Sequence, residues 1–276
     1  MLQARAVARE RDRAEAQRAA AERVSGFLQE LFTEADPNQA SASDVTVREI
    51  LDRGAARVLA DLDSEPRIQA SLAVVMGRVL RAIGEYDAAR PLLDSALAVR
   101  TRDPDATGIE LGDAYLERGA LAYDLGAYHE AAELHAEALG AYRTTEDGAS
   151  PRVASALDWI SVSLQEEGRL EESVEYGRAA VEAYRALDPE PNEELASVLV
   201  SFSDLLRTAG RMDEALAVNR EALEMTRAVY GDSHLEVAAA LNQMASTLEE
   251  HGRAEEAVAL VEEGLAIRRA AFDGPH

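Results

Sequence analysis

Two histidines in the stretch HEAAELH, His129 and His135, come nearest to a metal-binding pattern in this chain. Helical zinc sites place two histidines four residues apart, because that spacing puts both rings on one face of the helix. Here the histidines are six residues apart, which turns the second ring about 120° away from alignment with the first. We therefore expect two ordinary helix-surface residues and no bound metal.

The stretch DPDATG, residues 103–108, resembles the opening of a calcium-binding loop. Such a loop needs a bidentate glutamate at its twelfth position. Counted from Asp103, the twelfth residue is Ala114, so we expect a turn between two helices instead. Trp159, the one tryptophan, is expected to pack between helices rather than to stack against a ligand.

Three carboxylates, Asp158, Glu166 and Asp204, could support acid–base chemistry, but no nucleophile, ligand set or phosphate-binding loop accompanies them. The chain has no cysteine, and all 28 of its basic residues are arginine. Cysteine nucleophiles, phosphate-binding-loop lysines and Schiff-base lysines are thereby excluded. We predict no catalytic residue and no cofactor, and an enzyme with an unrecognised site remains the least favoured alternative.

The net charge of −24 disfavours nucleic acid as a partner, because an acidic surface repels phosphates. No apolar run approaches the roughly 18 residues that span a membrane, and no secretory signal opens the chain. We expect a soluble region that does not insert into a membrane. It is either tethered to one through an upstream segment or cytoplasmic.

An internal repeat predicts the helices that position these residues. A marker glycine recurs at intervals of 42 residues, at Gly84, Gly126, Gly168, Gly210 and Gly252. A period of this size is typical of stacked supersecondary units. Glycine takes the left-handed conformation in which many helices end, so each marker is predicted to end the first helix of a pair.

Small residues hold fixed places around each marker. They stand seven residues before it, at Gly77, Gly119, Ser161, Ser203 and Ala245, and five after it, at Ala89, Ala131, Ser173, Ala215 and Ala257. They also stand twelve after it, at Ala96, Ala138, Ala180, Ala222 and Gly264. Small side chains let two helices pack closely, which predicts antiparallel helix pairs from about Pro66 to about Ala271.

These positions, the period and the segment LNQMASTLEEHGRAEEAVALVEEGLAIRR (Leu241 to Arg269) resemble the tetratricopeptide repeat family, in particular its kinesin-light-chain subtype. The resemblance implies an all-α fold, a right-handed α-solenoid of five 42-residue helix-turn-helix repeats with an N-terminal helical extension. The boundaries expected are a charged linker helix over 1–23, a degenerate helical capping unit over 24–65 and the solenoid over 66–276.

Several arginines have a predicted place in this scheme. Arg118 departs from the pattern, since Met76, Ile160, Phe202 and Met244 occupy its place in the other units. Its head must reach solvent or a carboxylate, or its helix is rotated. Five arginines near the ends of the second helices are expected to complement the helix C-termini: Arg100, Arg143, Arg185, Arg227 and Arg269.

In the first 65 residues, Thr46 and Glu49 form a capping-box pattern for a helix running to about Leu62. The fragments RERDRAEA, AERVSGFLQELF and TVREILDRGAARV resemble the region that follows the kinase domain and membrane helix of bacterial receptor-type serine/threonine kinases. The resemblance implies a regulatory or sensor region of such a kinase. No kinase motif is present in the chain itself.

The family resemblance also implies a concave groove lined by the first helices. Its expected lining residues are Arg78, Arg81, Asp113, Leu116, Tyr123, Asp158, Gln165, Asp204, Arg207, Asn242 and Glu249. Arginines concentrate at the N-terminal end of this set and carboxylates elsewhere. A peptide with basic residues or a partner helix could lie there, and a plain solvated face is the alternative.

The sequence therefore predicts a non-catalytic protein-interaction module, with a kinase regulatory region as the first hypothesis. A free-standing cytoplasmic adaptor or scaffold is the alternative, and self-association is a further way to act. The final residues FDGPH resemble the inter-repeat turn YGDSH, so further repeats are expected to follow in a longer chain.

Overall fold

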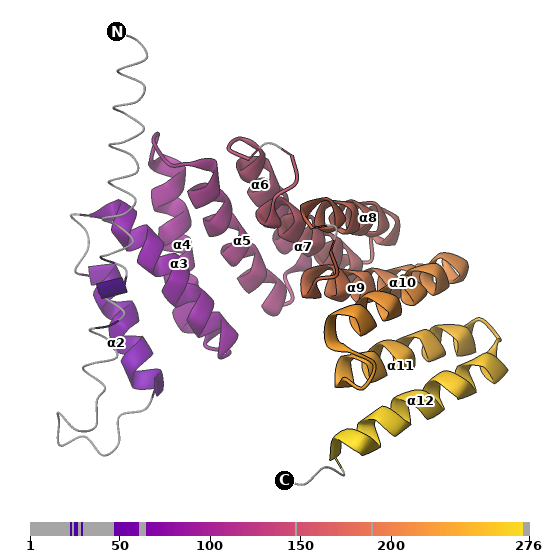
Figure 1. Ribbon diagram of the computed structural model, residues 1–276. Coiled ribbons are helices and arrows are strands. Elements are labelled where there is room, and N and C mark those ends of the chain that lie inside the picture. Colours follow the sequence, from indigo (N-terminus) through magenta and orange to yellow (C-terminus); the bar gives the residue numbers. More distant parts are fainter. Residues whose placement is uncertain are drawn as a thin grey trace. The chain divides into compact units, whose positions relative to one another are not determined.

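The computed structural model describes Arg23, Ser25, Gly26 and Gln29 and residues 47–60, 65–146, 148–188 and 190–272. Within these residues all regular structure is helical (Figure 1). The helices are α2 (Val47–Ala60), α3 (Pro66–Ala82), α4 (Tyr86–Arg102), α5 (Gly108–Asp124), α6 (Tyr128–Arg143), α7 (Pro151–Glu167), α8 (Leu170–Leu187), α9 (Glu193–Thr208), α10 (Met212–Tyr230), α11 (Leu235–Glu250) and α12 (Ala254–Phe272). None of them combines the length and apolar character that a membrane crossing requires.

The predicted linker helix over 1–23, most of the segment 24–46, and Thr46 of the capping box lie outside the described residues. The helix predicted to begin there is present as α2 (Val47–Ala60), and its predicted end at Leu62 lies outside the described residues. The chain divides into two compact units within α5, at Leu121 and Ala122. Unit 1 runs from Met1 to Leu121 and unit 2 from Ala122 to His276.

The marker glycines have the predicted conformation. Their φ angles lie between 75° and 84°, at Gly84, Gly126, Gly168, Gly210 and Gly252. At each one the next residue donates its backbone N–H to a carbonyl five residues back, as Arg169 does to Leu164 at 2.9 Å. This bond defines the Schellman helix end. The glycine therefore turns the chain from the first helix of a pair into the second.

The small residues of the repeat are buried where helices approach one another. A Cβ atom at Gly77 would lie 2.5 Å from Leu93 Cδ2 in unit 1. In unit 2 a similar close approach occurs at Gly177, outside the predicted small positions, where a Cβ atom would lie 2.8 Å from Phe202. Ser161 and Ser173, which stand at small positions, satisfy their buried hydroxyls by donating to each other's backbone carbonyls at 2.9 and 2.7 Å. The predicted all-helical fold of paired helices is confirmed.

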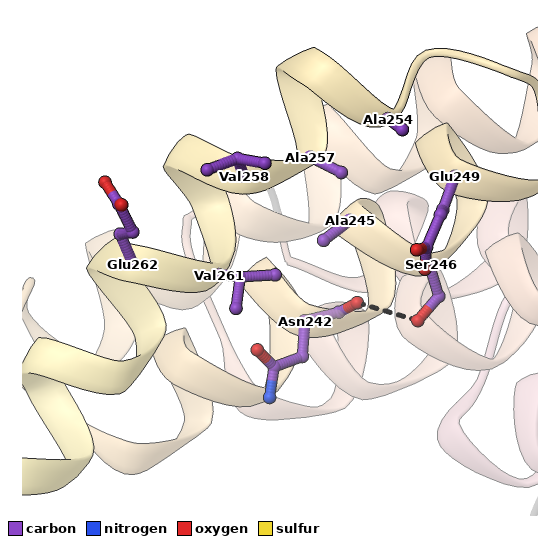
Figure 2. A pocket seen from close by; sticks show the side chains of 9 residues that line it. All are labelled: Asn242, Ala245, Ser246, Glu249, Ala254, Ala257, Val258, Val261 and Glu262. Atoms are coloured by element: carbon purple, nitrogen blue, oxygen red, sulfur yellow. Dashed lines mark hydrogen bonds between the residues drawn. The ribbon is translucent and has the colours of Figure 1, made fainter.

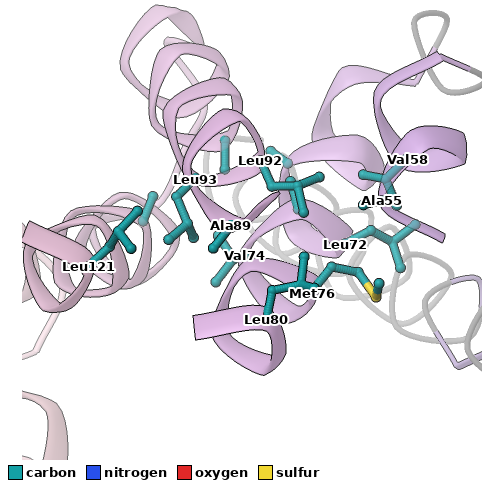
Figure 3. Close-up of a cluster of buried hydrophobic side chains, with 14 of the residues drawn as sticks. Ala55, Val58, Leu72, Val74, Met76, Leu80, Ala89, Leu92, Leu93 and Leu121 are labelled. Carbon is teal, nitrogen blue, oxygen red and sulfur yellow. The ribbon is translucent and has the colours of Figure 1, made fainter. Parts of the chain in front are cut away.

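Unit 1 is built around one apolar cluster (Figure 3). Leu72, Met76 and Leu80 of α3 pack with Leu92 and Leu93 of α4. The α2 helix adds three more buried side chains to the same cluster, Leu51, Ala55 and Val58. This burial holds α2 against the first helix pair.

The structure shows the partners of two arginines of unit 1, Arg118 and Arg100, that the sequence did not identify. Arg118 reaches a carboxylate, since its Nε lies 2.6 Å from Asp94 Oδ1. Arg100 lies in the last turn of α4, as expected, but its side chain is buried. It pairs with Glu110 at 2.9 Å and donates to Ser71 Oγ at 2.6 Å, so it joins neighbouring helices.

The stretch 103–108 forms the predicted turn between α4 and α5. Asp103 accepts the backbone N–H of Asp105 at 3.0 Å and pairs with Arg67 Nε at 2.6 Å. The adjacent guanidinium holds the pKa of Asp103 below its ordinary value. Its carboxylate therefore braces the turn.

Candidate interaction surface

The predicted groove residues all lie on the first helices of the pairs, α3, α5, α7, α9 and α11. On α7, Asp158 and Gln165 are seven residues apart and so share one face of the helix. We call this face the first-helix stripe; in unit 2 it holds Asp158, Val162 and Gln165 on α7, Val200, Asp204 and Arg207 on α9, and Asn242, Ser246 and Glu249 on α11.

In unit 1 the stripe is largely neutralised. Arg78 Nε lies 2.6 Å from Glu117 Oε1, and Arg81 Nε lies 3.7 Å from Glu117 Oε2. Glu117 is buried, and the sequence analysis did not select it. The carboxylate of Glu117 therefore offsets part of the expected positive charge at this end. Asp113 and Leu116 on α5 are half-buried.

An aromatic cluster occupies the start of unit 2. Tyr123 meets Tyr128 and Trp159 edge-on, with ring centroids 5.4 and 5.6 Å apart. Burial raises the pKa of Tyr123, and nearby Glu166 adds to the effect. Trp159 thus packs against residues of α5 and α6, as predicted, and Tyr123 is part of this packing.

His135 was expected at the surface, and this prediction is wrong. Its side chain is 0% exposed, its Nδ1 lies 3.0 Å from Ser163 Oγ, and its ring lies 5.3 Å from that of Trp159. His129 is exposed and pairs with Glu167 at 2.9 Å. Among the described residues, no group of three potential ligands could hold a metal ion.

Asp158 is the least compensated charged group on the stripe. It is half-buried, and it makes no hydrogen bond or ion pair with any residue that the structure describes. Burial raises its pKa from the ordinary 3.8 to about 6. Burial raises the pKa of the Tyr184 hydroxyl on α8, and the carboxylate of Asp158 adds to the effect, so the two groups are electrostatic neighbours. The carboxylate thus has unused capacity to accept hydrogen bonds.

The next helix carries a closed network instead. Arg207 donates to Asp204 at 2.6 Å and to Glu250 at 2.7 Å. The two carboxylates surround one guanidinium, and their hydrogen bonds raise the pKa of Arg207. Asp204 is therefore engaged in an ion pair with Arg207.

On α11 the stripe borders a pocket of about 490 Å³ (Figure 2). Asn242, Ser246 and Glu249 contribute its polar lining, and Ala257, Val258 and Val261 lie on the α12 side. The pocket lies within the last helix pair. Two of the predicted groove residues, Asn242 and Glu249, therefore line a hollow in the structure.

Comparisons with known proteins agree with this architecture. A family model described as tetratricopeptide repeat matches residues 69–144, 152–228 and 194–270. No match is found among curated proteins.

Solved structures share the fold at low sequence identity. BtubC (BKLC) from P. vanneervenii is 20% identical, with a TM-score of 0.72 over 84% of this chain and 94% of that chain. A putative kinesin light chain of Podosopora anserina with nearly identical TPR-like repeats is 17% identical, with a TM-score of 0.68 over 75% and 98%. YrrB, a TPR protein with an unusual peptide-binding site, is 18% identical, with a TM-score of 0.53 over 77% and 93%.

Proposed function

Because this chain belongs to the tetratricopeptide repeat family, we propose that it is a non-catalytic interaction module that binds a basic peptide segment on the first-helix stripe of unit 2. The observation that carries the proposal is the state of Asp158. Its carboxylate is desolvated without a hydrogen bond from the described residues. Such a group costs folding free energy, and binding a cation would offset that cost.

The chemistry of the ligand follows from the side chains nearby on the stripe. Gln165 lies seven residues after Asp158, on the same face of α7. It is half-buried, and its amide can both donate and accept hydrogen bonds. Arg207 is already held by Asp204 and Glu250, so it does not offer a free cation to an acidic ligand. An arginine of the ligand would give Asp158 the charge-assisted hydrogen bonds that it lacks.

Trp159 provides the experiment, since it is the only tryptophan and directly follows Asp158. An octapeptide of alternating alanine and arginine is titrated into the full chain, with alternating alanine and glutamate as the comparison. We expect the arginine peptide to change Trp159 fluorescence and the glutamate peptide not to. Asp158→Asn should weaken binding about tenfold or more.

Glu224→Gln is the matched control, because Glu224 is exposed on α10 and the change removes the same charge. Equal binding of both peptides, or equal loss in Asp158→Asn and Glu224→Gln, would show that only the overall acidity attracts the ligand. The proposed site would then be wrong.

At the level of the whole protein, we propose that the module regulates a bacterial serine/threonine kinase. The support is the likeness of the segment TVREILDRGAARV to the region between kinase domain and repeats in such proteins. Sequencing the natural reading frame tests this directly. A kinase domain and an apolar helix upstream would support it, whereas a frame without a kinase domain would leave a free-standing adaptor.

A further inference from the structure

The last helix, α12, exposes three large apolar side chains. Val258 is 55% exposed, Val261 47% and Leu265 44%. They recur at three- and four-residue spacing and so lie along one side of the helix. We call these three residues the α12 face. Val258 and Val261 also line the pocket next to Asn242 and Glu249 of α11 (Figure 2).

The preceding helix pair shows what such a face does in this fold. The residues 42 positions earlier, Leu216, Asn219 and Leu223, are only 1%, 3% and 8% exposed. The covering element is α11: Leu216 clusters with Ala245 and Leu248, and Leu223 with Leu241. Asn219 Nδ2 donates to Thr247 Oγ1 at 2.9 Å. The α12 face is thus the register equivalent of a surface that holds a helix.

The charges at this surface differ from those of the preceding pair. Arg207 of α9 pairs with Glu250 of the covering helix at 2.7 Å. Glu249 of α11 lies 42 residues after Arg207 and so occupies the equivalent position in the last pair. The charge at this position is therefore negative instead of positive. Glu262, which also lines the pocket, takes the register of Arg220. A helix that covers the α12 face as α11 covers the preceding pair must therefore bring a cation where α11 has Glu250.

We propose that the α12 face and its pocket bind an amphipathic helix of another protein, one with an apolar stripe and a basic residue opposite Glu249. The apolar stripe would bury Val258, Val261 and Leu265 and remove their exposed apolar surface from water. A second copy of this chain would present Glu249 and Glu262 to the same carboxylates, and that like-charge contact disfavours it. The site shares Asn242, Ser246 and Glu249 with the first-helix stripe, but it does not include Asp158.

The probe is a synthetic peptide with the sequence of residues 235–252 in which Glu250 is replaced by arginine, and the unmodified peptide is the comparison. Binding to the full chain is measured by calorimetry. We expect the Glu250→Arg peptide to bind at least tenfold more tightly than the unmodified one. Replacing Glu249→Arg in the protein should reverse this preference, which tests the charge contact from both sides.

Val261→Asp should abolish binding, and its melting temperature should stay near that of the natural chain because the side chain is already exposed. Val79→Asp, at a 38% exposed valine of α3, is the matched control and should bind normally. The peptide could instead bind by displacing α11 from α10, since it has the sequence of α11. In that case Val261→Asp would leave binding intact. Asp158→Asn should also leave it intact, so this proposal and the proposed function can fail independently.

Several outcomes would overturn the proposal. These are no binding of either peptide, a preference that Glu249→Arg does not reverse, and binding that survives Val261→Asp. A dimer in solution that Val261→Asp dissociates would show that a second copy covers the face. A longer natural chain that excludes the peptide with a helix of its own would equally contradict a partner in trans.

Discussion

Two carboxylates of the first helices, Glu117 in unit 1 and Asp158 in unit 2, have opposite surroundings. In unit 1, Arg78 and Arg81 share the buried carboxylate of Glu117. In unit 2, Asp158 lies half-buried with no hydrogen bond from the described residues, and its pKa is raised to about 6. Unit 1 thus has compensated charges that support the fold. Unit 2 has an uncompensated one, which is what a ligand-binding residue is expected to be.

The largest expected change in stability concerns a small residue that is buried in both units. Ala215 of α10 is fully buried, as is its register equivalent Ala89 of α4. Ala215→Arg should overpack a helix contact and cost about 1–3 kcal/mol or more of unfolding free energy. Ala228→Arg, exposed on the same helix, is the control. Thermal unfolding followed by circular dichroism would show an unchanged melting temperature if the register were misassigned.

The second effect tests compensation in unit 1. Glu117→Gln leaves two arginines without their shared carboxylate, and Arg81 is mostly buried. We expect a loss of about 1–3 kcal/mol, less than for a fully buried pair because Arg78 is half-exposed. Hydrogen exchange of α3 and α5 amides should quicken. Unchanged exchange would mean that solvent compensates these arginines as well as Glu117 does.

Asp158→Asn should increase the unfolding free energy, whereas Glu117→Gln should decrease it. The carboxyl pKa is higher in the folded chain, about 6, than its ordinary 3.8, so ionisation above pH 6 costs folding free energy. We expect the variant to be more stable by about 1–3 kcal/mol at pH 7. The gain should shrink as the pH falls through 6 and vanish below 4, where both states hold the proton.

Unfolding monitored by Trp159, which lies in unit 2, measures this change. A variant that is less stable than the natural chain at pH 7 would show that Asp158 has a stabilising partner. It would also remove the contrast between the two units.

Most of the helix architecture was predictable because a 42-residue register repeats the same packing problem. The marker glycines and the small residues, such as Ala89 and Ser173, occupy their predicted places because close helix contacts and left-handed turns tolerate few side chains. The burial of Arg100 was missed because its residue type favoured a helix-end interpretation. Its carboxylate partner, Glu110, lies on the next helix.

Errors at the candidate site have a similar cause. His135 was judged by its distance from His129, yet its register equivalents Leu93 and Asn219 are buried, and this signal was present in the sequence. Glu117 lies 39 residues after Arg78 in the sequence, which is about one helical turn short of a full repeat. The two side chains meet only because their helices, α3 and α5, are stacked in the fold. The raised pKa of Asp158 depends on burial, which no sequence pattern reports.

The most direct test of the account is the pH dependence of arginine-peptide binding, read from Trp159 fluorescence between pH 5 and 8. A cationic ligand favours the ionised carboxylate, so affinity should rise as the pH increases through about 6 and level off above 7. Asp158→Asn should bind weakly and show no such rise. An affinity that is flat across this range, or a rise that persists in Asp158→Asn, would contradict the claim that Asp158 is the binding residue.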